Sequence, residues 1–156
     1  MSDEPPVRVA LRVHDVAAAA ALYEGLGFVR IGAVPDPNGL MVMAILRRGP
    51  LQLLVDALEG IPFPDTARER LTQSGPRGLG VVIGIEVADV DETARRCTAA
   101  GCTIAAGPES APWGERYVEV EDPDGYLWKF FRVLPDPPDD GLQAAADMWF
   151  GTGLTQ

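Results

Sequence analysis

Near the start of the chain, apolar and polar positions alternate, and the pattern that follows predicts a strand, a helix and three further strands. In residues 7–13 every second residue is apolar, which is typical of a strand with one buried face. Asp15 then begins a helix that runs to about Leu26, because its carboxylate can accept the free amide hydrogens of the first turn. Further strands follow, and we expect them over residues 28–34, 40–47 and 51–57.

The same pattern returns further along the chain. Residues 80–88 alternate again, and Asp89 is placed to open a helix that Gly101 ends. The spacing from Asp15 to Gly27 is twelve positions, and so is the spacing from Asp89 to Gly101. The apolar positions of the two opening strands also correspond, which indicates an internal repeat of a β-α-β-β-β module. Val9, Leu11 and Val13 fall on Ile83, Ile85 and Val87.

A hairpin closes the second module, after a strand that we expect over residues 102–106. From Tyr117 to Glu121 apolar and charged residues alternate, as in a half-buried strand. The sequence Asp122-Pro123-Asp124-Gly125 then predicts a tight turn, because proline presets φ early in a turn and glycine accepts a positive φ further on. Residues 127–133 resume as an apolar strand.

These elements predict an α+β fold built from two tandem β-α-β-β-β modules. The first module covers residues 1–60 and the second covers residues 79–134. Residues 61–78 form a linker in which Asp65 caps a short helix, and residues 135–156 form an acidic linker with a short C-terminal helix. Each module alone would leave one sheet face bare. We therefore expect curled mixed sheets around a concave groove, with the helices outside.

The final hairpin resembles that of a known superfamily. Pro112-Trp113-Gly114 and the Asp122-Pro123-Asp124-Gly125 turn, together with the internal repeat, are similar to the glyoxalase/bleomycin-resistance/dioxygenase superfamily, also called vicinal oxygen chelate proteins. The similarity covers roughly residues 7–133. It is nearest to the metal-free bleomycin-resistance branch. That branch implies a symmetric dimer that binds a small molecule and does not turn it over.

Metal-dependent members of this superfamily hold their ion with side chains from the first and last strands of each module. Carried over by spacing, these positions are Arg8, Val82, Lys129 and, in the less regular first module, Gln52 or Leu53. None of these side chains is a good ligand for a divalent cation. Two of them carry a positive charge that would repel one. The resemblance therefore implies neither a metal nor another cofactor.

The sequence contains no other arrangement of residues that is typical of catalysis. It has no G-x-S-x-G elbow, no phosphate-binding loop and no cysteine–histidine pair with a third orienting group. The single histidine, His14, lies one residue out of register with the metal position and is expected at the surface. Cys97 and Cys102 are expected to be free buried thiols. We therefore expect no catalytic residue.

The sheet face opposite the helices is the candidate binding surface. Its small residues leave room and its charges can orient a ligand; by alternation it carries Arg8, Ala10, Arg12, Val82, Gly84, Glu86 and Lys129. Either Tyr117 or Val118 joins this face, depending on the register of the hairpin. The alternative is a satisfied salt-bridge network that holds two sheets together.

An aromatic residue is expected at the mouth of this groove. Trp113 lies on a loop between Pro112 and Gly114, and the branch resembled here stacks a flat heteroaromatic group on a tryptophan in this setting. The alternative is a tryptophan that covers the core. Phe63, in the linker, could border the site, although packing is the favoured role. The candidate ligand-binding residues are therefore Arg8, Arg12, Phe63, Glu86, Trp113, Tyr117 and Lys129.

Charge and composition narrow the range of partners. The formal net charge is −10, which disfavours nucleic acid because phosphates require a basic surface. No apolar run approaches the ~20 residues of a membrane span, and the opening residues lack the features of a secretory signal. We expect a cytoplasmic protein with no membrane partner. Open sheet edges favour a homodimer.

Together these observations predict a metal-free small-molecule-binding protein of bleomycin-resistance type. It would sequester a planar or amphipathic compound such as an antibiotic. One alternative is an enzyme of the same superfamily, a lyase, isomerase or dioxygenase, that uses unusual metal ligands or an acid–base pair such as Glu86 with Tyr117. Another is a regulatory module with no small ligand.

Overall fold

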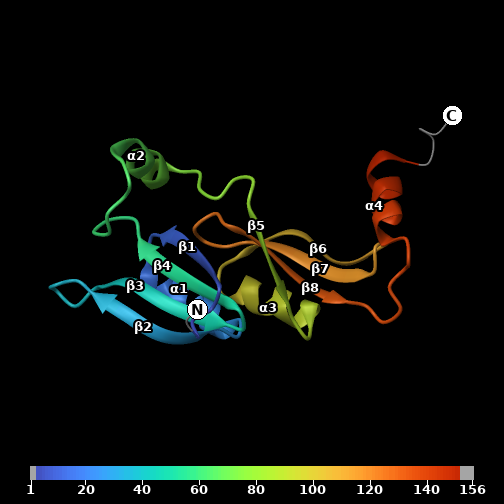
Figure 1. The fold of residues 1–156 in the computed structure, drawn as a ribbon, viewed down its shortest axis with the longest axis horizontal. Helices are drawn as coiled ribbons and strands as arrows, with labels where there is room; N and C mark the ends of the chain where they lie inside the picture. Colours follow the sequence, from blue (N-terminus) through green and yellow to red (C-terminus); the bar gives the residue numbers. More distant parts are fainter. Residues whose placement is uncertain (1–2, 152–156) are drawn as a thin grey trace. The chain divides into compact units, whose positions relative to one another are not determined.

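The structure is a computed structural model, which describes residues 3–151 of the chain. It confirms the predicted α+β fold class, with two four-stranded mixed sheets, neither closed on itself, and four helices in the described residues (Figure 1). The chain divides into two compact units between Arg77 and Gly78, with one sheet in each unit. None of the helices in this part of the chain combines the length and apolar character needed to cross a membrane.

The first unit has the predicted strand–helix–strand–strand–strand order, followed by one more helix. Its elements are β1 (Val7–Val13), α1 (Val16–Gly25), β2 (Val29–Pro35), β3 (Met41–Arg48), β4 (Leu51–Ala57) and α2 (Thr66–Ser74). The sheet order is β1-β4-β3-β2. Strands β1 and β4 are parallel, and the other neighbours are antiparallel.

The second unit repeats this topology. Its elements are β5 (Val82–Glu86), α3 (Val90–Ala99), β6 (Thr103–Ala111), β7 (Glu115–Glu121), β8 (Leu127–Val133) and α4 (Gly141–Phe150). The sheet order is β5-β8-β7-β6, with β5 and β8 parallel. The repeat seen in the sequence is therefore a repeat of strand order and strand direction.

Aspartates begin three of the helices, as the sequence indicated. Asp15, Asp65 and Asp89 each accept a hydrogen bond from the backbone amide three residues on, at 3.0, 2.7 and 2.9 Å. Each carboxylate satisfies an amide that has no partner within its own helix. Helix α4 differs, because Asp140 makes no such side-chain bond.

Each sheet buries one face under its first helix. In the first unit α1 packs on β3 and β4. In the second unit α3 packs on β6, β7 and β8. Fully buried side chains on these faces include Val13, Leu46, Leu53 and Val55 in the first unit, and Val118, Val120, Trp128 and Phe130 in the second. Cys97 and Cys102 are free and buried, as expected.

Two strands in the second unit differ in length from the sequence prediction. Strand β6 continues to Ala111, although alternation predicted its end at Ala106. Its pairing with β7 shifts register twice, so the side chains stop alternating regularly and the sequence pattern fades before the strand ends. Strand β5 covers only residues 82–86 of the predicted 80–88. Its first residue, Val82, pairs with Leu127, which is the first residue of its partner β8.

Candidate ligand-binding site

The register of the second sheet shows which side chains share its open face, opposite α3. Lys129 lies between Gly84 on β5 and Glu119 on β7. Phe131 lies between Glu86 and Tyr117 in the same way. Tyr117 rather than Val118 therefore joins the open face, because neighbouring residues of a strand point to opposite sides and Val118 is fully buried in the core.

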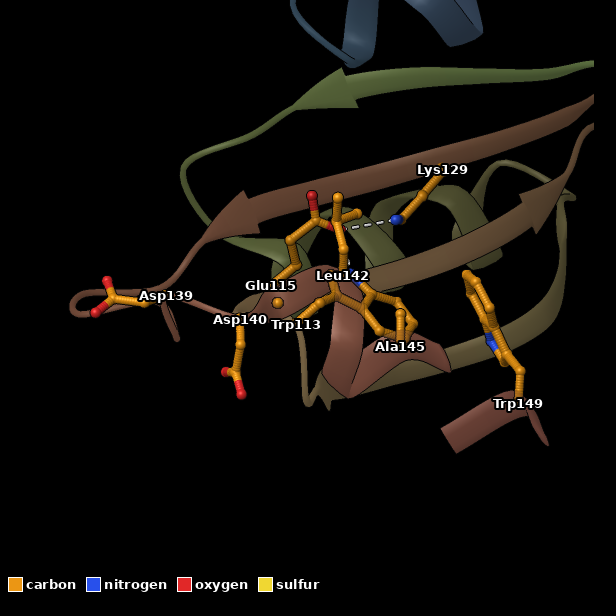
Figure 2. A pocket seen from close by; sticks show the side chains of 9 residues that line it. Trp113, Glu115, Lys129, Asp139, Asp140, Leu142, Ala145 and Trp149 are labelled. Carbon is orange, nitrogen blue, oxygen red and sulfur yellow. Dashed lines mark hydrogen bonds and ion pairs between the residues drawn. The ribbon is translucent and has the colours of Figure 1, made fainter. Parts of the chain in front are cut away.

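A pocket of about 590 Å³ lies between this open face and α4 (Figure 2). Its size falls within the range of small-molecule sites, roughly 300–1,000 Å³. Apolar and aromatic side chains line it beside one ion pair and two acidic residues: Trp113, Glu115, Lys129, Asp139, Asp140, Gly141, Leu142, Ala145 and Trp149. Two of the predicted site residues, Trp113 and Lys129, thus lie in one pocket.

Trp113 lies on the turn between β6 and β7 and is half-buried. Its indole Nε1 donates a hydrogen bond to Glu115 Oε2 at 2.9 Å. Its ring is stacked with Tyr117 at a centroid distance of 5.9 Å and an interplanar angle of 24°. The ring of Trp149, on α4, lies 5.8 Å away at 51°. The indole is therefore fixed in orientation and faces the pocket.

Lys129 and Glu115 form an ion pair at the floor of the pocket, with 2.7 Å between Nζ and Oε2. The ammonium also lies 4.9 Å from the ring centroid of Tyr117 and 5.6 Å from that of Trp113, which are favourable cation–π distances. Burial acts to raise the pKa of Glu115, but hydrogen bonds from Lys129 and Trp113 and the charge of Lys129 outweigh it and hold that pKa below its usual value. Glu115 is thus an anion that neutralises Lys129.

Tyr117 forms the base on which Trp113 rests. It is buried, and its hydroxyl donates a short hydrogen bond to Glu109 Oε1 on β6. This hydrogen bond, with smaller effects from burial and from nearby carboxylates, raises the pKa of Tyr117 to about 12. The phenol therefore stays protonated near neutral pH and cannot act there as a general base.

The remaining predicted site residues lie outside this pocket. Glu86 borders a separate hollow of about 350 Å³ with Val87, Ala88 and Arg132. Arg8 is exposed, and its Nη2 lies 3.8 Å from Oε2 of Glu4. Arg12 and Phe63 come together in the first unit, with the guanidinium carbon 3.8 Å from the ring centroid.

The guanidinium of Arg12 is committed to holding the linker. It donates hydrogen bonds to the backbone carbonyls of Ala57, Ile61 and Pro62 at 3.0, 2.9 and 2.6 Å. Phe63 stacks against the same group. Phe63 therefore packs on Arg12 at the start of the linker. These contacts give Arg12 a structural function there.

The residues at the superfamily's metal positions do not fit a divalent cation. The first-module candidates are now resolved: Gln52 lies opposite Arg8, whereas Leu53 is in the core. Lys129 pairs with Gly84, which corresponds through the repeat to Ala10, and Ala10 pairs with Leu54. Leu54 rather than Gln52 or Leu53 is therefore the counterpart of Lys129. Neither leucine nor lysine supplies a ligand to a cation.

Within residues 3–151 no group of three or more histidine, cysteine, aspartate or glutamate side chains is arranged to hold a metal ion. The open faces of the two sheets carry cationic and apolar side chains where the superfamily's metal ligands would stand.

Among the lining residues that sequence reasoning missed, Glu115 and Trp149 make the contacts with Trp113. Glu115 follows a glycine on a turn, where alternation carries no information about facing. Trp149 belongs to a tail that lies outside the repeat, so no register could place it. In the structure the ring of Trp149 contacts that of Trp113. Met148 and Phe150 remain mostly exposed on the chain itself.

Comparison with known proteins agrees with the fold. A family model for the glyoxalase/bleomycin resistance protein/dioxygenase superfamily matches residues 6–130. An uncharacterized protein of Mycobacterium bovis is 31% identical over 143 residues, which cover 91% of this chain and 92% of the relative. The crystal structure of TioX from Micromonospora sp. ML1 is 30% identical, covering 82% of this chain and 98% of that one, with a TM-score of 0.60.

A further solved structure supports the fold alone. It is a family enzyme from Burkholderia phytofirmans PsJN, 23% identical, and the match covers 81% of this chain and 97% of that one with a TM-score of 0.64. The family match ends before the acidic linker and α4 begin. It takes in both β-α-β-β-β modules almost completely. The chain therefore belongs to the glyoxalase/bleomycin resistance protein/dioxygenase superfamily.

Proposed function

We propose that this protein is a metal-free small-molecule-binding protein of bleomycin-resistance type, which sequesters a planar or amphipathic compound such as an antibiotic. The observation that carries the proposal is the pocket of about 590 Å³, which the indoles of Trp113 and Trp149 line together with the Lys129–Glu115 ion pair. Aromatic walls with a few convergent polar groups are typical of ligand sites.

The binding mechanism follows from these side chains. Burial of a flat ring against Trp113 removes apolar surface from water and adds the interaction of stacked rings, worth about 0.5–1.5 kcal/mol beyond the burial itself. Lys129 has three N–H donors, and Glu115 accepts one of them. Within residues 3–151 no further hydrogen-bond acceptor engages the ammonium, so its other donors can bond to a polar group on the ligand. Because Glu115 neutralises the lysine, a ligand need not carry a negative charge.

An enzyme of the same superfamily is the second candidate, but no observation favours it. The acid–base pair considered from the sequence was Glu86 with Tyr117. In the structure the hydroxyl of Tyr117 donates to Glu109, and Glu86 borders a separate hollow, so nothing in the described residues brings the two groups together on one ligand. The residues at the metal positions, Arg8, Leu54, Val82 and Lys129, offer no set of ligands to a catalytic ion.

The proposal also places the protein in the cytoplasm, as a homodimer. The free thiols of Cys97 and Cys102 suit a reducing compartment. The edge strand β2 carries exposed apolar side chains at Val29, Ile31 and Val34, which a second subunit could cover.

Native mass spectrometry of protein purified directly from its host tests the proposal. It reports subunit number, bound metal and retained ligand in one spectrum. We expect a dimer without a stoichiometric transition metal, carrying an organic compound that is released when Trp113 is replaced by alanine. One equivalent of zinc, iron or manganese that survives dialysis would contradict the metal-free proposal and favour an enzyme.

A further inference from the structure

Helix α4 rests on the pocket through few contacts. Of its ten residues only Ala145 is buried. Its exposed apolar side chains are Leu142, Met148, Trp149 and Phe150. Asp140 gives the helix no side-chain cap, unlike the aspartates that begin α1, α2 and α3. Such a helix can leave the sheet at a small cost in free energy.

Trp149, on this helix, nevertheless contacts the ring on which a flat ligand would stack. Its ring centroid lies 5.8 Å from that of Trp113, a distance of direct contact between aromatic rings. A flat ligand placed between two rings needs them about 7–8 Å apart, twice the usual carbon–carbon contact distance. No such ligand fits between these two indoles as they stand.

The other ring against Trp113 cannot make room. Tyr117 is buried within strand β7, and its hydroxyl is bonded to Glu109. Trp149 is 64% exposed and belongs to the weakly held helix. Of the two aromatic rings that contact Trp113 within residues 3–151, Trp149 is therefore the one that a stacking ligand can displace.

We propose that Trp149 is a built-in competitor for the ligand, so that a compound stacks on Trp113 by taking the place of this indole and lifting α4 from the pocket. The inference rests on the proposed function and adds that the docked position of Trp149 lowers the affinity for the ligand. A protein whose binding-competent form is only partly populated shows an affinity reduced by that fraction. Removal of the competing ring must then strengthen binding.

The test compares Trp149→Ala with Phe150→Ala in the full-length chain. Phe150 is a matched control, because it is 66% exposed on the same helix and, in the described part of the chain, makes no ring contact with Trp113. The probes are proflavine, a flat cation, and anthraquinone sulfonate, a flat anion, titrated by fluorescence. Circular dichroism of the coupled Trp113 and Trp149 indoles reports whether the two rings touch, with or without a probe.

We expect Trp149→Ala to bind the better probe about tenfold more tightly, Trp149→Phe to fall between it and the parent, and Phe150→Ala to match the parent. The coupled indole signal should disappear from the parent as the probe saturates. If the parent binds a probe and Trp149→Ala binds it equally well or more weakly, the proposal that Trp149 competes with the ligand is wrong. The proposed function is not contradicted by that result. If neither the parent nor Trp149→Ala binds either probe, both proposals fail.

Discussion

At the scale of single residues, two tryptophans of the second unit lie in different surroundings. Trp128 is 1% exposed, stacks on Phe130 and donates its indole N–H to Asp122. Trp113 also donates to a carboxylate, but it is half-buried and faces a pocket. The difference arises from position. Trp128 points to the α3 side of a central strand, whereas Trp113 lies on a turn at the edge of the open face.

Substitution of these two residues should separate stability from binding. Trp128→Ala leaves a cavity in the core and should lower the free energy of unfolding by ~3–5 kcal/mol. Trp113→Ala should cost clearly less stability, yet weaken the binding of a flat ligand by ~1–3 kcal/mol. Thermal melting measures the first effect and probe titration the second. If Trp113→Ala were as unstable as Trp128→Ala, Trp113 would belong to the core.

Tyr117 offers a pH-dependent prediction. Its pKa is raised in the folded protein to about 12 by the hydrogen bond to Glu109. A raised pKa means that the bond stabilises the fold fully below the usual tyrosine pKa of about 10, and that this contribution is lost as the pH rises through about 12. Ultraviolet absorbance of the phenolate should show one step near pH 12 that is absent from Tyr117→Phe. Glu109→Gln should move this step to lower pH; a step that stays in place would contradict the assigned cause.

At the scale of elements, the connection to α4 depends on a close approach of two backbone segments. Gly114 has a φ of +95°, and a Cβ built on it would lie 2.7 Å from Pro137 Cβ and 2.9 Å from Pro138 Cδ. Leu134 also donates its backbone N–H to the Gly114 carbonyl at 2.9 Å. The acidic linker therefore packs directly on the turn that carries Trp113, and it sets where α4 begins.

Gly114→Ala should detach this linker, and Gly39→Ala is its matched control. Both glycines have a positive φ, so each alanine costs about 1–2 kcal/mol in backbone strain. Only at Gly114 does the new methyl group also meet another segment, since nothing lies within 4 Å of a Cβ at Gly39. The coupled Trp113–Trp149 dichroism signal should disappear in Gly114→Ala and persist in Gly39→Ala. Its survival in both would show that α4 docks without this contact.

Elements with strong local signals could be predicted from the sequence, and elements positioned by tertiary contacts could not. Asp15 and Asp89 each cap a helix by accepting a hydrogen bond from the amide three residues on. Capping could be predicted because it depends only on neighbouring residues of the chain. The end of β6 escaped prediction because shifts in its pairing register break the alternation. The place of Trp149 depends on a long-range contact with Trp113, which no periodicity records.

The same distinction explains which of the predicted residues lie on the open face of the second sheet and which are engaged elsewhere. Lys129 and Tyr117 were selected through strand alternation, and the register of β7 and β8 places them on the open face. Glu86 shares that face but borders another hollow. Arg12 was selected by the same rule, yet a segment 45 or more residues away supplies carbonyls that engage its guanidinium. Alternation predicts the sheet face on which a side chain lies. It does not predict which distant segment of the chain contacts that side chain.

At the scale of the whole molecule, the two modules share a topology but differ in the chemistry of their open faces. The first sheet carries a guanidinium engaged by the linker, and the second carries the aromatic pocket. The duplicated strand order supplies two similar scaffolds, and in the second unit the C-terminal helix α4 lines a pocket on the open face. The proposed binding site therefore lies in the second unit.

Self-association is a prediction at this scale. Strand β2 is an edge of its sheet, and its exposed apolar residues favour burial in a symmetric dimer. Sedimentation at tens of micromolar should show a dimer, and Ile31→Lys, which places a charge on that edge, should shift the equilibrium towards monomer. A parent protein that sediments only as a monomer would contradict the dimer. An unchanged dimer in Ile31→Lys would place the interface elsewhere.

The central claim, that a flat small molecule binds at Trp113 on the open face of the second unit, is tested most directly by nuclear magnetic resonance. The chain has three tryptophans, and their indole N–H groups give separate signals. With proflavine or anthraquinone sulfonate, the account predicts that the signals of Trp113 and Trp149 move together and saturate, while that of Trp128, bonded to Asp122 in the core, stays in place. Saturable binding that leaves the Trp113 signal unmoved would contradict the account.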